Sequence, residues 1–536
     1  MNFKKTLTAL ALTTALALPF AGTAMQADAA TPPNMLVVAG QIDDLISLDP
    51  QEMFEFSGTD YANNVYQTLI SYDPKDFSKG YGPDIAESWE VSEDGKTYTF
   101  KIADGQKFAS GNPVTAKDVE FSLRRAVLLG KTPSFIVTQF GFTADNVDST
   151  LVAKDDSTFV MVTDKKYAPS FVLNCMTAAI ASIVDSALVM EHEKDGDFGN
   201  EWLKTNSAGS GPYKLTSWKP NEALTIEANP EYSGDAPAMK RVIVRHIGES
   251  ASQRLLLEKG DVDIARNLSP EDVAGLGDAE GVEMQTDLRG RIMYISMNQT
   301  DPILSKPKVV EAIKYLIDYD GMANSFLKGN YMVHQAFLPL SYLGELKDKP
   351  FSLDVEKAKT LLAEAGYPDG FEVEFIVRTA QERVEIAQSL QNTFSQAGIK
   401  VSIVQGTGKE TLGKYRARTF QIYVGAWGPD YPDPHTNADT FTSNPDNRLE
   451  AKLTGKLAWR NAWPAEGFTE RTAAAIVESD TETRRQMYVD LQKDFQKEAP
   501  FAIMFQMTEQ NGIRDNIEGY SIGSAISAVY YGNVTK

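Results

Sequence analysis

Residues 83–100 read PDIAESWEVSEDGKTYTF and form the most informative stretch of this chain. The segments Trp89 to Val91 and Thr97 to Ile102 are rich in β-branched and aromatic residues and flank a short polar run. Within that run, Gly95 can adopt the positive φ that a tight turn requires. The stretch therefore predicts a β-hairpin.

A helix is expected directly downstream, where residues 111–118 read GNPVTAKD. Thr115 is a favourable N-cap residue, and Asp118 suits the positive N-terminal end of a helix. Val119, Leu123, Ala126 and Val127 then follow at helical spacing and predict one apolar face.

Further downstream, strand-like and helix-like segments alternate at the spacing of an α/β protein from Met293 to Phe505, whereas the earlier region carries more hairpin signals. Met293 to Met297 and Phe501 to Phe505 are expected to be buried strands. The other expected strands are 241–246, 371–377, 399–404 and 419–425, with Val262 and Ile264 resuming strand character. The expected helices are 252–258, 307–317, 358–365, 382–397 and 483–497.

The composition excludes several classes of protein. The 536 residues contain 52 Lys and Arg against 73 Asp and Glu, a formal net charge of −21. This charge argues against nucleic acid as a partner and against adsorption on an anionic membrane surface. The only cysteine, Cys175, excludes an internal disulfide framework and a Cys-rich metal site.

The N-terminus has the features of a secretory signal peptide over residues 1–29. Lys4 and Lys5 precede a mostly apolar, uncharged run from Leu7 to Phe20, and Ala27-Asp28-Ala29 has the small-x-small form of a cleavage site. A membrane anchor is the alternative, but the apolar run is shorter than the ~20 residues that a span needs. No cysteine lies near the cleavage site, so we expect a periplasmic protein and not a lipoprotein.

No catalytic motif stands out. Asp94-Gly95-Lys96-Thr97 lacks the upstream glycine of a phosphate-binding loop, and no G-x-S-x-G or H-E-x-x-H occurs. His435 lies in an acidic loop with Asp430, Asp433 and Asp439, which could bind a metal, and Asp430 with Asp433 could act as an acid–base pair. A solvated loop is the favoured interpretation, because such loops collect Asp and Pro for turn formation. We expect no enzyme activity, no metal and no cofactor.

Several sequence blocks resemble one known family. Leu48-Asp49-Pro50 and the stretch from Pro83 to Arg125 are similar to the extracytoplasmic solute-binding proteins of peptide ABC importers, the dipeptide- and oligopeptide-binding type. Four later blocks agree with the family in the same order, so that the resemblance spans essentially the whole mature chain. These blocks are Gly209 to Tyr213, Val309 to Asp318, Gly398 to Val401 and Trp427 to Pro434.

The resemblance implies an α/β fold of two lobes, the periplasmic binding protein fold of class II, in which the lobes close around a hinge. Lobe I is expected over 30–290 with an extra subdomain at about 72–205, and again over 500–536. Lobe II is expected over 291–499. The strands Met293–Met297 and Phe501–Phe505 would then be the two hinge crossings.

The resemblance also implies ligand-binding residues. In the family, the aspartate of a W-x-x-D loop receives the ligand's α-amino group, which here is Asp430 following Trp427. An arginine of the second lobe receives the carboxylate in dipeptide-binding members, and the best matching position is Arg378. Asp430 could instead brace its own loop, and Arg378 could be a surface residue paired with Glu374 or Glu382.

On the opposite lobe, the resemblance implies that the backbone of Phe56, Ser57, Gly58 and Thr59 lies along the ligand like an extended strand. An ordinary glycine turn is the alternative. Trp427 is either a wall of the pocket or part of the core. Trp459 and Trp463 either shape a ligand-specific wall or pack against lobe II.

The function implied by the resemblance is capture of short peptides in the periplasm and their delivery to an inner-membrane ABC permease, by a monomer that binds no nucleic acid. The alternative keeps the same transport role for a non-peptide ligand, such as an amine-bearing, opine-like or glutathione-like compound, a metal chelate or a sugar conjugate. The presence of Asp430 favours a ligand with an amino group.

Overall fold

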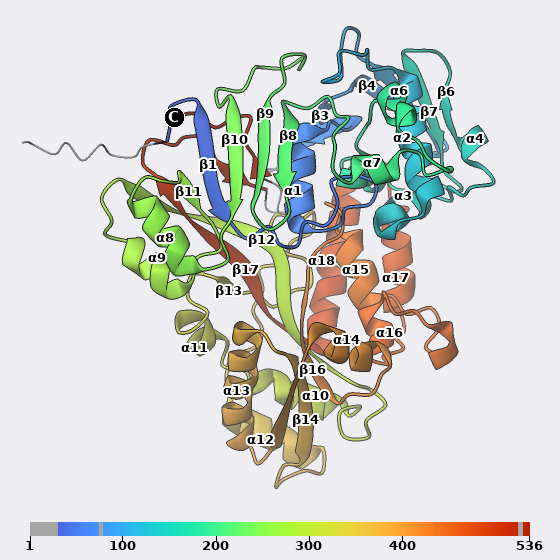
Figure 1. The fold of residues 1–536 in the computed structure, drawn as a ribbon. Helices are drawn as coiled ribbons and strands as arrows, with labels where there is room; N and C mark the ends of the chain where they lie inside the picture. The colour runs from blue at the N-terminus through green and yellow to red at the C-terminus, as the bar shows by residue number, and fades with distance from the viewer. Residues whose placement is uncertain (1–30, 74–78, 524–528) are drawn as a thin grey trace, which may run out of the picture.

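A computed structural model describes residues 31–73, 79–523 and 529–536 of the chain (Figure 1). The predicted signal peptide lies outside the described residues. Among the helices that the structure describes, none combines the length and hydropathy needed to cross a bilayer.

A twisted eleven-stranded sheet runs through the described part of the molecule, in the order β15-β14-β16-β12-β17-β11-β1-β10-β9-β8, with β13 paired to β17. The sheet is parallel where β14 pairs with β15 and β16, and where β1 pairs with β10 and β11. Its strands are β1 (Met35–Gly40), β8 (Tyr213–Lys219), β9 (Ala223–Ala228), β10 (Arg241–His246), β11 (Ile264–Ala265), β12 (Val282–Met297), β13 (Tyr331–Val333), β14 (Glu372–Arg378), β15 (Lys400–Gly406), β16 (Ile422–Trp427) and β17 (Phe501–Arg514).

The long antiparallel pair β12 and β17 joins the two halves of this sheet and runs diagonally through the molecule (Figure 1). Its ladder is interrupted: Leu288 pairs with Thr508 and Ile292 with Gln506, so that residues 289–291 face the single residue Met507. The Gln506 side chain holds this bulge by donating to the Arg289 carbonyl at 3.0 Å and accepting the Leu340 N–H at 2.8 Å. The bulge turns side chains out of the regular pleat.

A smaller four-stranded sheet, β4-β5-β7-β6, lies beside the upper half of the large sheet (Figure 1). β4 (Ala86–Val91) and β5 (Thr97–Ile102) form the predicted hairpin, with Gly95 at φ 70° in the turn. Asp118 accepts hydrogen bonds from the N–H and the hydroxyl of Thr115, which confirms the predicted start of α2 (Ala116–Leu129). The predicted apolar face of α2 is buried. The other short strands are β2 (Ile70–Tyr72), β3 (Tyr81–Pro83), β6 (Leu151–Ala153), β7 (Thr158–Val162), β18 (Ser521–Ile522) and β19 (Val529–Tyr530).

The helices pack on the faces of the sheets (Figure 1). Those predicted from the sequence form with ends shifted by up to three residues, and β17 extends well beyond the predicted Phe501–Phe505. The helices are α1 (Phe56–Val65), α2 (Ala116–Leu129), α3 (Phe135–Thr138), α4 (Val147–Thr150), α5 (Pro169–Cys175), α6 (Ser186–Glu191), α7 (Asn200–Leu203), α8 (Ser250–Glu258), α9 (Pro270–Leu276), α10 (Pro307–Tyr315), α11 (Tyr319–Asn324), α12 (Val355–Glu364), α13 (Gln381–Ser395), α14 (Gly408–Arg416), α15 (His435–Thr442), α16 (Leu457–Arg460), α17 (Phe468–Ala475) and α18 (Thr481–Glu498). Short 3₁₀ turns occupy Thr132–Ser134, Ala179–Ala181 and Leu449–Ala451.

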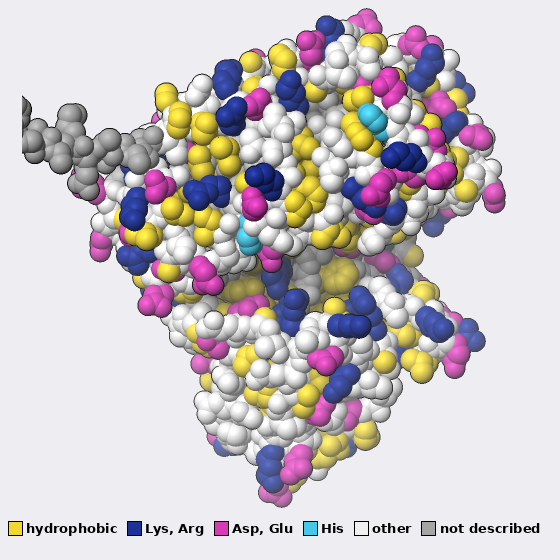
Figure 2. Space-filling model, viewed as in Figure 1, with side chains coloured by type: hydrophobic (Ala, Val, Ile, Leu, Met, Phe, Trp, Pro, Cys, Tyr) yellow, Lys and Arg dark blue, Asp and Glu magenta, His cyan; other side chains and the backbone are white. Residues whose placement is uncertain are grey.

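An upper part, built on β1, β8–β10 and the small sheet, and a lower part, built on β14–β16, face each other across a hollow (Figures 1 and 2). Met293 to Met297 and Phe501 to Phe505 are buried strands, as predicted, and lie in the stretch of β12 and β17 that enters the lower part. Figure 2 shows Lys and Arg side chains gathered along the lower rim of the hollow, although the whole chain is acidic.

Candidate functional site

Three neighbouring cavities lie along the cleft between the two parts. The Arg378 cavity, of about 440 Å³, contains Phe56 and Arg378 in its lining, and the Phe54 cavity, of about 160 Å³, contains Phe54, Phe56 and Asp430. The Arg460 cavity, of about 550 Å³, contains Phe54, Asp430 and Arg460. Phe56 is therefore shared by the first two cavities, and Phe54 and Asp430 by the last two. Two of the three volumes fall in the range of about 300–1,000 Å³ that is typical of small-molecule sites.

The sheet topology places the two predicted charged residues. β14 and β16 are neighbouring parallel strands, with Val377 beside Val424. Arg378 is the last residue of β14, and β16 ends at Trp427 just before Asp430. Because the carboxyl ends of parallel strands meet at one edge of a sheet, both charges leave the sheet on the side that faces the upper part. Ligands of open α/β sheets commonly bind outside such strand ends.

Asp430 is half-buried in the cleft and lines two of the cavities. Its backbone N–H donates to the Thr436 hydroxyl at 3.1 Å, which fixes the loop. Burial raises the pKa of the Asp430 carboxyl to about 7, and the Thr436 hydroxyl offsets this only in part. No cation among the described residues forms an ion pair with the Asp430 carboxylate or lowers its pKa. The site thus holds a carboxyl group that lacks a positive partner.

Arg378 is exposed at the end of β14, and its guanidinium lies against Gly408, where a Cβ would come within 3.2 Å of Nε. Within the described part of the chain it forms no ion pair with Glu374 or Glu382, the partners that an ordinary surface role would favour. Glu382 instead lies 3.9 Å from the Arg291 guanidinium. Arg378 and Arg291 both line the same cavity.

The bulge in β12 accounts for two further arginines of this cavity, because Arg289 and Arg291 are turned toward the cleft where the ladder is interrupted. Behind them lies a buried network in which Arg266 donates to Asp60 and to Glu509, both at 2.9 Å, and Arg289 lies 3.3 Å from Glu509. Burial alone would raise the pKa of Glu509, but the two guanidinium groups hold it below its ordinary value. These charges are paired and form a wall of the site.

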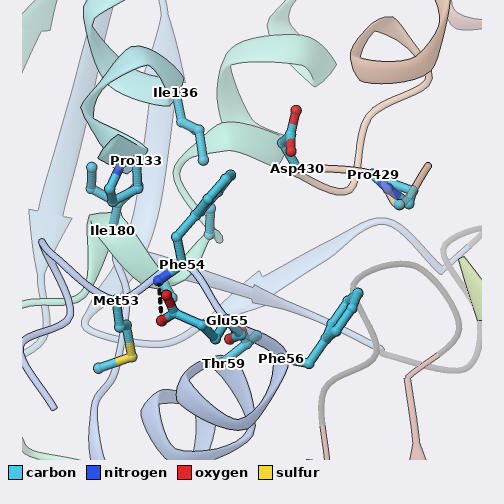
Figure 3. A pocket seen from close by; sticks show the side chains of 13 residues that line it. Met53, Phe54, Glu55, Phe56, Thr59, Pro133, Ile136, Ile180, Pro429 and Asp430 are labelled. Carbon is cyan, nitrogen blue, oxygen red and sulfur yellow. Dashed lines mark hydrogen bonds between the residues drawn. The ribbon is translucent and has the colours of Figure 1, made fainter. Parts of the chain in front are cut away.

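The Phe54 cavity is apolar on one side. Figure 3 shows the Phe54 ring between Ile136 and the loop that carries Asp430, with Phe56 on the other side of the segment. Phe54 and Phe135 form an edge-to-face pair, with ring centroids 5.9 Å apart, although they remain 40% and 39% exposed. Exposed aromatic rings inside a cleft offer apolar surface that a ligand can cover.

The expectation for Phe56, Ser57, Gly58 and Thr59 is wrong in its backbone geometry. These residues form the first turn of α1 and are neither an extended strand nor a glycine turn. Gly58 lies against Met53, where a Cβ would come within 3.1 Å of that side chain, so the glycine serves close packing inside the upper part. Phe56, Ser57 and Thr59 still line the cleft, and the extended residue before the helix is Glu55.

The tryptophans separate into two groups. Trp427 is half-buried and lines the Arg460 cavity while also packing on the core of the lower part. Trp459 is buried, donates to the Arg448 carbonyl and has Arg418 3.9 Å above its ring. Trp463 packs on aromatic rings of α17 and α18. Trp459 and Trp463 line none of the three cavities.

Asp433 serves the structure of the loop. Its buried carboxylate accepts two hydrogen bonds from the Arg484 guanidinium, at 2.9 and 2.7 Å, and others from Asn174 and the His435 N–H. Burial would raise the pKa of Asp433, but Arg484 holds it below its ordinary value. Asp439 is paired with Lys456 at 2.5 Å. Within the described residues there is no group of three or more His, Cys, Asp and Glu arranged to hold a metal ion.

Sequence reasoning missed several cleft residues. Arg289 and Arg291 directly precede a buried strand, and this clustering of charge is the only signal that could have marked them. Phe54 and Arg460 carry no local signal, because their positions follow from contacts between distant segments.

Comparisons with known proteins agree that this chain is similar to bacterial solute-binding proteins. The model of the family described as "Bacterial extracellular solute-binding proteins, family 5 Middle" matches residues 80–448. The Escherichia coli K12 relative named "Probable D,D-dipeptide-binding periplasmic protein DdpA" is 29% identical over 538 residues, which cover 99% of this chain and 98% of the relative.

Two solved structures share the fold. HbpA2 from Haemophilus parasuis has a TM-score of 0.78 at 22% identity, with 94% of this chain and 99% of the other covered. The ABC transporter-associated periplasmic binding protein DppA from Helicobacter pylori, solved in complex with the peptide STSA, has a TM-score of 0.75 at 23% identity. That match covers 94% of this chain and 98% of the other.

Proposed function

The chain belongs to the bacterial extracellular solute-binding proteins of family 5, and from this premise we propose that it captures short peptides for an ABC importer. It has the two-lobed α/β fold of its structural neighbours. The name of the Escherichia coli relative refers to a D,D-dipeptide, and the Helicobacter pylori protein was solved with a bound peptide, which supports a peptide ligand here.

The observation that carries the proposal is the Asp430 carboxyl, which lies in the cleft without an ion-pair partner among the described residues. A peptide in neutral water bears an α-ammonium group, and burying that charge is costly unless an acid pairs with it. An ammonium at Asp430 would supply the missing partner and favour the ionised carboxylate. Asp430 is the receptor for the amino end of the ligand.

The carboxyl end of the ligand belongs at Arg378. Its guanidinium is exposed in the cleft, forms no ion pair among the described residues and can bind a carboxylate through two parallel hydrogen bonds. Arg291 lines the same cavity and adds positive charge. Phe56, Ser57 and Thr59 contact the ligand through side chains of the first turn of α1, and Trp427 forms part of the wall beyond Asp430.

Closure around the ligand follows from the connection between the parts. Lobe I comprises 30–290, with its subdomain at about 72–205, and 500–536, and lobe II comprises 291–499. The crossing in β12 then lies at the bulge at 289–291, where the ladder is interrupted, and the crossing in β17 lies at its start, where Phe501 pairs with Ser296. Rotation there moves Asp430 and Arg378 relative to α1.

The remaining parts of the proposal concern export, location and partners in the cell. The chain is exported by a cleaved signal peptide over residues 1–29, acts in the periplasm as a monomer without a lipid anchor, and delivers its ligand to an inner-membrane permease. Its role is binding without catalysis. The substrate-binding names of its relatives support this, as does the pairing of Asp433 with Arg484, which leaves Asp430 without an acid–base partner.

The amino role is tested with Asp430→Asn and two peptides that differ only in N-acetylation. Calorimetry should show that the variant binds the peptide with the free amino group more weakly than the wild type does. The affinity for the acetylated peptide, which is already lower in the wild type, should not change. Asp446→Asn is the control, because Asp446 forms an exposed ion pair with Arg448 outside the three cavities. An equal loss for both peptides in Asp430→Asn excludes the amino role.

Arg378→Ala should in the same way weaken binding of a dipeptide more than binding of its C-terminal amide. Native mass spectrometry of the gently purified protein gives the ligand class directly. A spread of added masses that dissociates into short peptides supports a broad peptide importer. A single mass that is not a peptide favours a specialised non-peptide ligand in the same site.

A further inference from the structure

The Arg460 cavity contains a buried cation that the fold itself does not neutralise. Arg460 is only 5% exposed, yet it forms no ion pair with a carboxylate among the described residues. Its Nε donates to the Thr454 carbonyl at 2.6 Å, and its guanidinium carbon lies 5.1 Å from the centre of the Tyr415 ring. The other buried arginines of the cleft, Arg266 and Arg289, are each paired with Glu509.

Two exposed cations line the same cavity. Arg416, at the end of α14, and Lys452 form no ion pairs among the described residues. Lys456 is also part of the lining, but Asp439 neutralises it. A cavity wall with one buried and two exposed cations that lack acidic partners favours an anionic occupant, because a buried charge is costly until it is paired.

The position of the cavity relates it to the ligand. Asp430 lines the Arg460 cavity, whereas Arg378 lies in a different cavity beyond Phe56. A peptide that places its ammonium at Asp430 and its carboxylate at Arg378 carries its first side chain on the same carbon as the ammonium. That side chain therefore starts beside the Arg460 cavity and has about 550 Å³ available to it.

We infer that the Arg460 cavity is a subsite for a carboxylate on the amino-terminal residue of the ligand, so that the preferred peptides begin with an acidic residue. This inference rests on the proposed function, because it uses the orientation set by Asp430 and Arg378. Arg460 receives the carboxylate, and Arg416 and Lys452 raise the local positive potential at the mouth of the cavity.

The test compares the dipeptides Glu-Ala and Gln-Ala, which have nearly the same shape and differ in one charge. Calorimetry on the wild-type protein should give at least about tenfold tighter binding of Glu-Ala, which is about 1.4 kcal/mol. The ratio should fall in Arg460→Met. Because Arg460 also packs on Tyr415, the double variant Arg416→Gln/Lys452→Gln provides a second test at exposed positions. There the ratio of the two affinities should fall at low salt.

Lys409→Gln is the matched control, since Lys409 is an exposed cation on the same helix as Arg416 and lines none of the three cavities. It should leave the ratio unchanged. Equal binding of Glu-Ala and Gln-Ala by the wild-type protein overturns the inference and leaves the proposed function standing. If the wild-type protein binds neither dipeptide nor any longer peptide, the proposed function fails and the inference falls with it.

Discussion

Acidification from pH 7 to pH 5 should weaken ligand binding through Asp430. Burial raises the pKa of this carboxyl to about 7 in the unliganded protein. The α-amino group of a peptide, with an ordinary pKa of about 7.7–8.0, stays protonated in this range, and its carboxyl group stays ionised. Only the ionised form of Asp430 can pair with the ammonium, so protons compete with the ligand.

The size of the effect follows from a comparison of the raised pKa of Asp430, about 7, with its ordinary value of 3.8. With a pKa of about 7, the carboxyl is about half ionised at pH 7 and about 1% ionised at pH 5, so the affinity should fall about 50-fold, or about 2.3 kcal/mol. With the ordinary value of 3.8, the same change would be only about 1.1-fold. The two cases are easily separated.

Calorimetric titration at several pH values between 5 and 7 measures this dependence. At pH 7, titration in buffers of different ionisation enthalpy should show release of about half a proton per ligand bound. His435 and Asp439 lie near Asp430, but burial lowers the pKa of His435 to about 4, and Lys456 holds the pKa of Asp439 below its ordinary value. Neither group titrates in this window.

Asp430→Asn is the control and should make the remaining affinity nearly independent of pH. The role of Asp430 in the pH dependence is refuted if the wild-type affinity changes less than about twofold between pH 7 and pH 5. It is refuted as well if Asp430→Asn keeps the full dependence, because another group would then bind the proton.

Three further predictions concern stability, measured by urea unfolding. Asp433→Asn should cost about 3–5 kcal/mol because it leaves a fully buried guanidinium without its charge partner, whereas Asp446→Asn, in an exposed pair of similar length, should cost less than about 1 kcal/mol; equal costs would contradict the role of burial. Gln506→Leu should cost about 1–3 kcal/mol because it leaves the half-buried Leu340 N–H and the buried bulge carbonyl of Arg289 without this partner, and an unchanged midpoint would show that the bulge holds without it. Lys314→Met removes a buried amine whose pKa burial lowers to about 7, below its unfolded value of 10.5. Since the unfolded chain then binds more protons between pH 7 and 10.5, the stability of the wild type relative to this variant should rise with pH above 7, by up to about 1.4 kcal/mol per unit, and a constant difference would contradict the assignment.

Local signals predicted the elements that local interactions build. The hairpin around Gly95 and the start of α2 at Thr115 depend on residues within a few positions of each other, and both form as predicted. The helices and strands between Met293 and Phe505 also follow their periodicity, with small shifts at their ends. Each such element buries one apolar face whichever distant segment packs against it, so its own hydrophobic periodicity is enough to predict it.

The geometry of the cleft could not be predicted in this way. Phe56 to Thr59 contain a glycine and two hydroxyl residues, which read locally as a turn, but they form the first turn of α1, where Gly58 packs on Met53. The bulge at 289–291 arises because β12 and β17 have unequal numbers of residues between their paired segments, a mismatch between strands more than 200 positions apart. The pairing of such distant strands is not visible within a short window of sequence.

Net charge gives a poor guide to the ligand, since a chain with a charge of −21 carries a cleft rich in arginine. The number of cations in the cleft is also a poor guide, because Arg266 and Arg289 are balanced by Asp60 and Glu509. A ligand gains from the charges that the protein leaves unbalanced, since pairing a desolvated charge recovers part of its burial cost. Among the described cleft residues, the carboxyl of Asp430 and the guanidinium groups of Arg378 and Arg460 are three such charges; Asp430 and Arg460 line one cavity at different positions, and Arg378 lines another. One acid and two bases, placed apart, complement a ligand with one ammonium group and two anionic groups.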